Sequence, residues 1–369
     1  MSVVDQARER ILAGAEVTSA VREATANREP PWRALLHVLA EVHGAGQAIQ
    51  PLLDDPAVTD VLINGDDDVW IDAGEGLRRV LTTVDARALA LRLATLAGKR
   101  LDNAAPIVDG RLPDGTRLHA VLPPLVHGSA HISLRRQARH RIGWEEMLSS
   151  GFLTPEFAEV IDQLIRTRAN ILVSGAGGAG KTTLVAAALG RVPPQERIVI
   201  IEEAVELMPA HPHLVHLQSR TPNVQGVGGI GLASLVRAAM RMRPDRLVLG
   251  ECRGEEVREM LSGFNTGHDG GWATIHANTA EDVPARLVAL GALAHMEPRT
   301  VELQAQAGLD AVVHVQRRCG VREVDHIGVV SKTGPLVVRP ALTRDPQARE
   351  ESAPGPGWAD LARKLDQGI

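Results

Sequence analysis

The sequence predicts an α/β protein in which a mainly parallel sheet, with helices on both faces, follows a smaller α+β domain. Two observations lead to this fold class. After residue 150, apolar runs such as NILVSG, ERIVIIEE and DRLVLGE alternate with helical segments, and strands that are apolar on both faces are typical of parallel sheets. The length of 369 residues also suits two domains of ordinary size.

The composition excludes several classes of protein. The hydrophobic fraction of 44% and the charged fraction of 23% are those of a folded globular chain. The net charge of -5, with 5 Trp, 3 Phe and no Tyr, argues against general nucleic-acid binding. Two separate cysteines, Cys252 and Cys319, exclude a disulfide scaffold and suit a reducing compartment. Charges at Asp5 and Arg8 argue against a signal peptide, so we expect a cytoplasmic protein with at most peripheral membrane contact.

The first part of the chain shows two patterns. Residues 1–48 have apolar positions at helical spacing and predict a helical leader. Residues 49–145 predict the α+β domain, with short strands in DVLING and DVWIDA, a helix in ARALALRLATLAG, and further strands in RLHAVLPP and HISLRR. The segment RRQARHRIGWEEMLSSG looks like an arginine-rich linker.

The second domain is expected over residues 150–335. It opens with a helix in TPEFAEVIDQLIRTRAN, and its strands and helices then alternate from NILVSG to the helix in EDVPARLVALGALA. Residues 336–369 are rich in proline, glycine and charge, which predicts a flexible C-terminal tail.

A phosphate-binding loop is the strongest local signal. SGAGGAGKTT fits the pattern G-x-x-x-x-G-K-[ST] between a predicted strand and a predicted helix, in a chain with only four lysines. Backbone N–H groups of such a loop surround the phosphates of ATP, Lys181 reaches the β and γ oxygens, and the Thr182 hydroxyl binds Mg²⁺. The predicted nucleotide-binding residues are Gly175, Ala176, Gly177, Gly178, Ala179, Gly180, Lys181, Thr182 and Thr183.

Hydrolysis further requires a group that positions water. RLVLGE places Glu251 at the end of an apolar strand, and IVIIEE places Glu202 and Glu203 at the end of another. Chemistry in doubly wound folds lies at such strand ends, where a carboxylate can orient water or hold Mg²⁺ through water. The alternative is that these glutamates are solvated caps.

The stretch GHDGGWATIHAN also has more than one interpretation. His268, Asp269 and His276 offer three metal ligands, but this stretch has neither a histidine pair at i, i+4 on a helix nor a cysteine close by, as common zinc sites have. A structural histidine is a second alternative. We favour a third, in which His276 contacts the phosphate region of the nucleotide and senses its state.

Four motifs in order and spacing resemble the secretion ATPases of type II, type IV pilus and type IV secretion systems. They are GAGGAGKTT, IIEEAVEL, RMRPDRLVLGECRGEE and FNTGHDGGWATIHANTAED, which match the Walker A loop, Asp box, Walker B motif and His box. Together with IQPLLDDPAVTDVLING and HISLRR, the resemblance covers about residues 48–335 and looks closest to the Tad pilus and conjugation branch. It implies a RecA-like P-loop NTPase domain.

The resemblance assigns roles residue by residue. It makes Glu251 the residue that activates water, Glu202 an acidic partner of water and Mg²⁺, and His276 the γ-phosphate sensor. Four arginines match those that face the triphosphate or a neighbouring subunit, although each is equally well a solvated surface charge: Arg111, Arg117, Arg135 and Arg136. Arg237, Arg241 and Arg243 are either a subunit contact or an exposed face. Glu203 stands where the family usually has aspartate, and the cysteine-rich metal motif of many relatives is absent from the sequence.

The expected function is that of a Mg²⁺-dependent ATPase that forms a homo-oligomer, by resemblance a hexamer, at the inner face of the cell membrane. Its expected partner is an inner-membrane platform protein of a pilus or secretion machine, with no specific nucleic acid. Two alternatives remain, a conjugation-type DNA or protein transfer motor and a nucleotide-binding ring component without catalysis.

Overall fold

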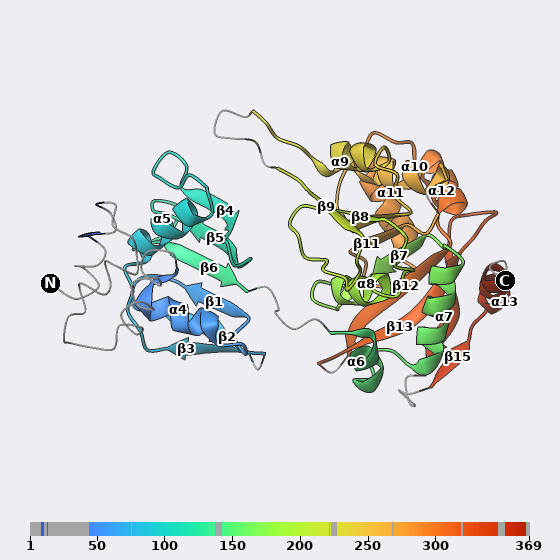
Figure 1. The fold of residues 1–369 in the computed structure, drawn as a ribbon, viewed down its shortest axis with the longest axis horizontal. Coiled ribbons are helices and arrows are strands. Elements are labelled where there is room, and N and C mark those ends of the chain that lie inside the picture. The colour runs from blue at the N-terminus through green and yellow to red at the C-terminus, as the bar shows by residue number, and fades with distance from the viewer. Residues whose placement is uncertain are drawn as a thin grey trace. The chain divides into compact units, whose positions relative to one another are not determined.

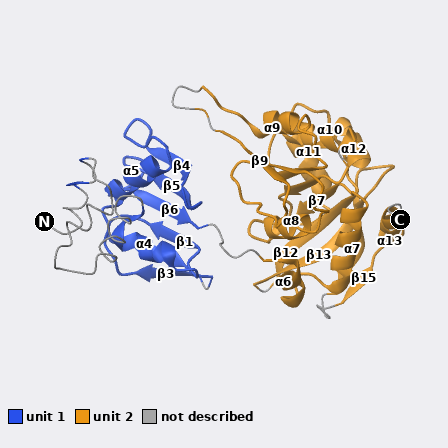
Figure 2. Cartoon of the chain, in the orientation of Figure 1, with its two compact units in different colours: residues 1–140 blue, residues 141–369 orange. Residues whose placement is uncertain are grey.

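The computed structural model describes residues 9–10, 13, 44–74, 76–136, 142–220, 222, 227–267, 269–318, 320–345 and 351–366. The chain divides into two compact units, residues 1–140 and 141–369 (Figure 2). Most of the predicted helical leader lies outside the described residues. No helix within the described ranges combines the length and the apolar character needed to cross a membrane.

Unit 1 is an antiparallel sheet with two helices. Its strands follow the order β3-β2-β1-β6-β5-β4. Their bounds are β1 Asp60–Ile63, β2 Val69–Asp72, β3 Leu77–Val80, β4 Ile107–Arg111, β5 Arg117–Val121 and β6 His131–Arg135, and the helices are α4 Gly46–Asp54 and α5 Ala86–Leu96. Alternate residues of β5 and β6, among them Leu118 and Leu134, are buried in one core with both helices. The α+β architecture predicted from the alternating pattern is confirmed.

Unit 2 is built on a nine-stranded sheet in the order β15-β14-β13-β12-β7-β11-β10-β8-β9 (Figure 1). The six strands from β12 to β9 in this order are parallel, and the other three are antiparallel to their neighbours. The strands are β7 Ile171–Ser174, β8 Ile198–Glu202, β9 Leu214–Gln218, β10 Arg246–Cys252, β11 Trp272–Ile275, β12 Ala311–Arg318, β13 Val321–Val330, β14 Val338–Arg344 and β15 Ser352–Pro354.

Both faces of this sheet are covered, as the apolar strands predicted. In β7, Ile171 and Val173 point into one core and Leu172 into the other. The first core includes residues of α6 Trp144–Ser149, α7 Pro155–Arg166, α8 Lys181–Leu189 and α13 Trp358–Asp366. The second includes residues of α9 Leu232–Ala239, α10 Val257–Asn265, α11 Val283–Leu293 and α12 Pro298–Gly308.

The C-terminal segment corrects one prediction. Residues 336–369, expected to be a flexible tail, supply β14, β15 and α13, and the Leu361 side chain of α13 is only 1% exposed. The prediction was wrong because Pro340 and the prolines and glycines before α13 obscured the pattern. Pro340 lies in β14 where the register with β13 shifts, a place where a strand tolerates proline. Trp358, Leu361 and Leu365 share one helix face that packs on the core.

Candidate active site

The phosphate-binding loop joins β7 to α8, and two glycines in it are required by their surroundings. Gly175 has φ 151°, and a Cβ at this position would lie 2.2 Å from the carbonyl oxygen of Val315 in β12. Gly180 has φ 109°, caps α8, and a Cβ there would lie 2.9 Å from the Phe152 ring. Only glycine fits such sites. The structure therefore brings the predicted residues 175–183 together at the N-terminus of a helix, which suits phosphate binding.

Lys181 is buried within this loop. Its Nζ donates to the carbonyl oxygens of Gly175 and Ala176, each at 2.9 Å. Burial lowers the pKa of Lys181, and the nearby carboxylate of Glu251 opposes that shift. The ammonium group is thus held against the loop, where it can exchange backbone oxygens for phosphate oxygens.

Glu251 and His276 contact each other directly. Glu251 lies near the end of β10, and its Oε1 is 2.6 Å from His276 Nε2. Oε1 is buried and has no hydrogen-bonded partner in the described structure, since this contact lacks hydrogen-bond geometry. Burial lowers the pKa of His276 below its usual 6.5, Lys181 acts in the same direction, and Glu251 opposes both. The imidazole is therefore mainly neutral at pH 7.

His276 also lies against the phosphate-binding loop. The sequence predicted that His276 lies within a strand, but it directly follows Ile275, the last residue of β11. A Cβ at Gly177 would be 3.7 Å from His276 Cε1. Beside them is an open pocket of about 460 Å³, lined by Ala176, His276, Ala277, Asn278, Asp282 and Arg286. The loop, Glu251 and His276 thus form one site.

Glu202 has a different surrounding. It is buried at the end of β8, and its Oε1 accepts hydrogen bonds from the backbone N–H groups of Glu206 and Leu207, at 3.0 and 2.9 Å. Among the described residues its Oε2 has no hydrogen-bonded partner, and His216 Nδ1 is 3.8 Å away. A Cβ at position 250 would lie 2.6 Å from Glu202 Cγ, so Gly250 makes room for this side chain. Oε1 therefore holds the loop that follows β8, whereas Oε2 is able to accept a hydrogen bond from water.

Arg253 is a residue of the site that the sequence reasoning missed. Its Nη2 pairs with Glu251 Oε2, and its Nη1 is 3.6 Å from Glu203 Oε2. The hydrogen bond to Glu251 raises the pKa of Arg253. The available signal was its place two residues after Glu251 in GECRG, where the turn that follows the strand returns the side chain to the carboxylate.

The chemistry of these donors fits Mg²⁺ better than a transition metal. Among the described residues no group of three or more His, Cys, Asp or Glu is arranged to hold a metal ion, and His268 lies outside them. The site instead offers the Thr182 hydroxyl at the start of α8 and the two buried carboxylate oxygens Glu202 Oε2 and Glu251 Oε1. Mg²⁺ prefers hard oxygen ligands and keeps several of its waters, so such a sparse set suits it.

The arginines of unit 1 fall into two places. Arg111 pairs in register with Arg117, and Arg117 with Arg135, so the three form one row across β4, β5 and β6. Cross-strand partners project from the same face of a sheet. Arg135 also pairs with Asp60, with 2.8 Å between Nε and Oδ1. Arg136 does not join the row and donates to the backbone oxygen of Asp55.

The arginines around α9 are on the surface of unit 2. Arg237 pairs with Glu259 of α10, at 2.5 Å between Nη1 and Oε1. Arg241 and Arg243 lie in the turn after α9. This arrangement occupies Arg237 within its own chain and leaves the other two near the surface.

Comparison with known proteins identifies the family of the chain. Residues 43–335 match the family of type II/IV secretion system proteins. The chain is 45% identical over 301 residues to a putative conjugal transfer protein of Mycobacterium tuberculosis, covering 79% of this chain and 85% of that one. It is 32% identical over 299 residues to the conjugal transfer protein TrbB of Rhizobium radiobacter, covering 76% and 87%.

Solved structures share the fold. The ATPase DotB of Legionella pneumophila superposes with a TM-score of 0.53 at 19% identity, covering 85% of both chains. The pilus retraction motor PilT, solved with bound ADP, gives a TM-score of 0.54 at 20% identity, covering 86% of both chains. These likenesses and the family match cover both units, and the chain therefore belongs to the type II/IV secretion system family, whose relatives include secretion ATPases.

Proposed function

We propose that the protein is a Mg²⁺-dependent ATPase that works as a hexameric ring motor at the cytoplasmic face of the cell membrane. Its partner in this proposal is an inner-membrane platform protein of a pilus or secretion machine. Family membership and the relatives' names, which include conjugal transfer proteins, an ATPase and a pilus motor, support the proposal. The observation that carries it is the contact of Glu251 with His276 beside Lys181 and the glycine loop.

The geometry suggests how ATP is cleaved. The loop N–H groups and Lys181 bind the β and γ phosphates, which places the γ-phosphorus beside His276. Glu251 Oε1 has no hydrogen-bonded partner among the described residues, and so it is able to accept a proton from an attacking water. The water oxygen bonds to the γ-phosphorus as the bond to the bridging oxygen breaks, giving ADP and phosphate. Neutral His276 donates a hydrogen bond to a γ-phosphate oxygen.

Mg²⁺, when bound, neutralises phosphate charge. Thr182 would hold it directly, and Glu202 would hold one of its waters through Oε2, the oxygen not used by the loop backbone.

The movement that does work is proposed to come from unit 1. The row of Arg111, Arg117 and Arg135 presents three cations on one face of its sheet, which suits a triphosphate in the same subunit or in a neighbour. Rings of identical subunits place a different surface of each subunit on either side of the interface, so a neighbour's arginine can complete a site. Loss of the γ-phosphate would then release this contact.

The proposal is tested by steady-state phosphate release with Mg-ATP, comparing the wild type with Glu251→Gln. We expect the variant to bind ATP within about threefold of the wild type and to turn over at least ~100-fold more slowly. Glu255→Gln is the matched control, because it removes the same charge from an exposed position four residues away. Turnover of Glu251→Gln near that of the control would overturn the assignment.

A conjugation-type motor for DNA or protein transfer is the second candidate. The 45% identity to a protein named for conjugal transfer favours it. Single- and double-stranded DNA added to the same assay decides, because a motor that acts on DNA turns over faster in its presence. Unchanged turnover at low salt would count against a DNA substrate. Nucleotide binding without turnover would instead favour a ring component without catalysis.

A further inference from the structure

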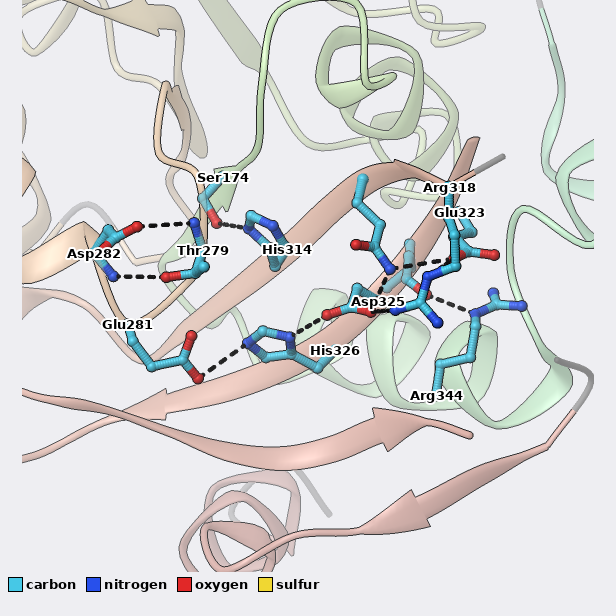
Figure 3. A network of polar contacts seen from close by, with 12 residues as sticks. Ser174, Thr279, Glu281, Asp282, His314, Arg318, Glu323, Asp325, His326 and Arg344 are labelled. Atoms are coloured by element: carbon cyan, nitrogen blue, oxygen red, sulfur yellow. Dashed lines mark hydrogen bonds and ion pairs between the residues drawn. The ribbon is translucent and has the colours of Figure 1, made fainter. Parts of the chain in front are cut away.

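Two buried histidines lie side by side beneath the phosphate-binding loop, and hydrolysis as described above does not use them. His314 of β12 and His326 of β13 are register partners, 4% and 6% exposed. Their rings are stacked with 5.5 Å between centroids (Figure 3). Burying two imidazoles together is costly unless their nitrogens are bonded, so the bonds that they make indicate what the pair does.

His314 joins two loops of the site. Its Nδ1 is 2.9 Å from Ser174 Oγ (Figure 3). The backbone of Asn278 accepts a hydrogen bond from the ring. Ser174 ends β7 and directly precedes Gly175, whereas Asn278 follows His276 by two residues. A neutral ring satisfies both partners when Ser174 donates to Nδ1 and the ring N–H, on Nε2, donates to the Asn278 carbonyl. One ring therefore ties the start of the phosphate-binding loop to the loop that carries His276.

Burial, more than the surrounding charges, favours the neutral form of His314. Burial lowers its pKa most, and His326 lowers it further, while the carboxylates of Asp325 and Glu281 oppose them. Both carboxylates lie closer to His326, with Asp325 Oδ2 2.9 Å from Nδ1 and Glu281 Oε1 3.8 Å from Nε2. From β7, the uncharged hydroxyl of Ser174 contacts His314.

We propose that His314 is a positioning residue that couples nucleotide binding at the phosphate loop to the placement of His276. This inference rests on the proposed ATPase function. When the phosphate-binding loop shifts at Ser174, the hydrogen bond moves the His314 ring with it. The second hydrogen bond, to Asn278, then moves the segment 276–278. The ring needs no contact with nucleotide to do this, because its two bonds are to Ser174 and to the backbone of Asn278.

The test compares Ser174→Ala and His314→Gln with the wild type. Ser174→Ala removes one bond and no bulk, and glutamine at 314 is able to replace Nε2 toward Asn278 but not Nδ1 toward Ser174. His211→Gln is the control, because the His211 ring bonds to the backbone of Pro193 and His213, away from the phosphate-binding loop in the sequence. Three quantities are measured at pH 7.5: nucleotide affinity, kcat, and hydrogen exchange of residues 176–182 and 276–279 with and without a non-hydrolysable ATP analogue and Mg²⁺.

We expect both variants to bind the analogue within about threefold of the wild type and to lose at least ~10-fold in kcat. Nucleotide should still protect residues 176–182 in the variants but no longer residues 276–279, whereas in the wild type and the control it protects both. Protection of both segments in a folded variant with normal kcat would overturn the coupling. Ser174→Ala decides if His314→Gln does not fold.

Failure of the proposed function is separately visible. A wild type that binds the analogue without turnover would sink the ATPase proposal, and hydrogen exchange would still decide whether His314 couples the two segments. A wild type in which the analogue protects only residues 176–182 would overturn the coupling whatever its turnover.

Discussion

His276 Nε2 lies 2.6 Å from Glu251 Oε1, so the residue proposed to sense the γ-phosphate and the residue proposed to activate water are in contact. Glu251 lies in β10, and His276 directly follows the neighbouring parallel strand β11. The two strands also share the hydrogen bond from Thr274 Oγ1 to the Gly250 carbonyl, 2.6 Å long. A ring that turns toward phosphate must loosen its contact with Glu251. Sensing and activation are thereby linked in one movement.

His276→Ala should separate binding from turnover. The loop N–H groups and Lys181 are unchanged, so we expect nucleotide affinity within about threefold of the wild type, while kcat falls by at least ~10-fold because a hydrogen bond to the transition state is lost. Fluorescent-nucleotide titration and phosphate release measure the two quantities. His295→Asn, at the exposed end of α11, is the control. Equal losses in affinity and kcat would contradict the sensor role.

The two glutamates of the acidic box should respond differently to substitution. Glu202→Ala leaves the buried N–H groups of Glu206 and Leu207 without an acceptor, which costs about 1–3 kcal/mol of unfolding free energy, whereas Glu202→Gln keeps an oxygen there. Glu203 is 60% exposed and pairs weakly with Arg253. Glu203→Asp should therefore leave the free energy of unfolding unchanged and alter kcat by no more than about twofold. Urea unfolding and phosphate release test both. Equal stability of Glu202→Ala and Glu202→Gln would refute the loop-holding role.

Stability should fall as the solution becomes acidic. The pKa of His314 is lowered in the folded protein by burial, so the unfolded chain takes up a proton near pH 6.5 while the native ring does not. The native state is therefore favoured above pH 6.5, and this advantage is lost as pH drops toward the folded pKa, by at most about 1.4 kcal/mol per pH unit. His276 shifts in the same direction.

Urea unfolding of the wild type and His314→Gln between pH 8 and pH 5.5 measures this effect. The wild type should lose unfolding free energy below pH 6.5, and the variant should lose less over the same interval. Parallel pH profiles of the two proteins would show that His314 takes no part in the titration.

Removal of residues 346–369 should destabilise unit 2. Burial of a leucine side chain contributes about 1.5–3 kcal/mol, and the segment buries Leu361 and Leu365 against the same core as α7. Leu361→Ala in the full chain should cost about 2–4 kcal/mol, and Asp366→Ala, at the exposed end of α13, less than about 0.5 kcal/mol. Thermal unfolding checks all three, and a truncated chain with unchanged Tm would contradict the packing.

The sequence was sufficient where the signal is local. Periodicity predicted β7, β8, β10, β11 and the helices α7 to α11, but not β9, β12, β13 or α12. One contiguous motif located Lys181 and its glycines. Contacts between distant residues could not be predicted in this way. The need for glycine at 175 comes partly from Val315, 140 residues later, and the hydrogen bonds of His314 reach β7 and the loop after β11. Such partners depend on strand order, which local patterns do not specify.

The same limit applied to residues whose surroundings change their role. The sequence indicated that Glu202 is a strand-end carboxylate available to water or Mg²⁺. In the structure its Oε1 accepts hydrogen bonds from the backbone of the loop that follows. Apart from its position two residues after Glu251, nothing in the sequence indicated that Arg253 pairs with that carboxylate, because an arginine in a turn is usually solvated. The prolines and glycines before α13 predicted a flexible tail. The three apolar residues that indicate a helix become significant only when the core on which they pack is known.

The packing of α13 on the core that contains α7 also orders the events of synthesis. Domains fold as units while the chain emerges from the ribosome, N-terminal part first. The described part of unit 1 is closed by β6 at Arg135, so its sheet can form early. Unit 2 needs β14 and α13, which are translated after α6, α7 and the phosphate-binding loop, to complete the core that begins with α6 and α7. Its phosphate-binding loop therefore emerges from the ribosome long before this core is complete, and unit 2 reaches its native state only after α13 has emerged.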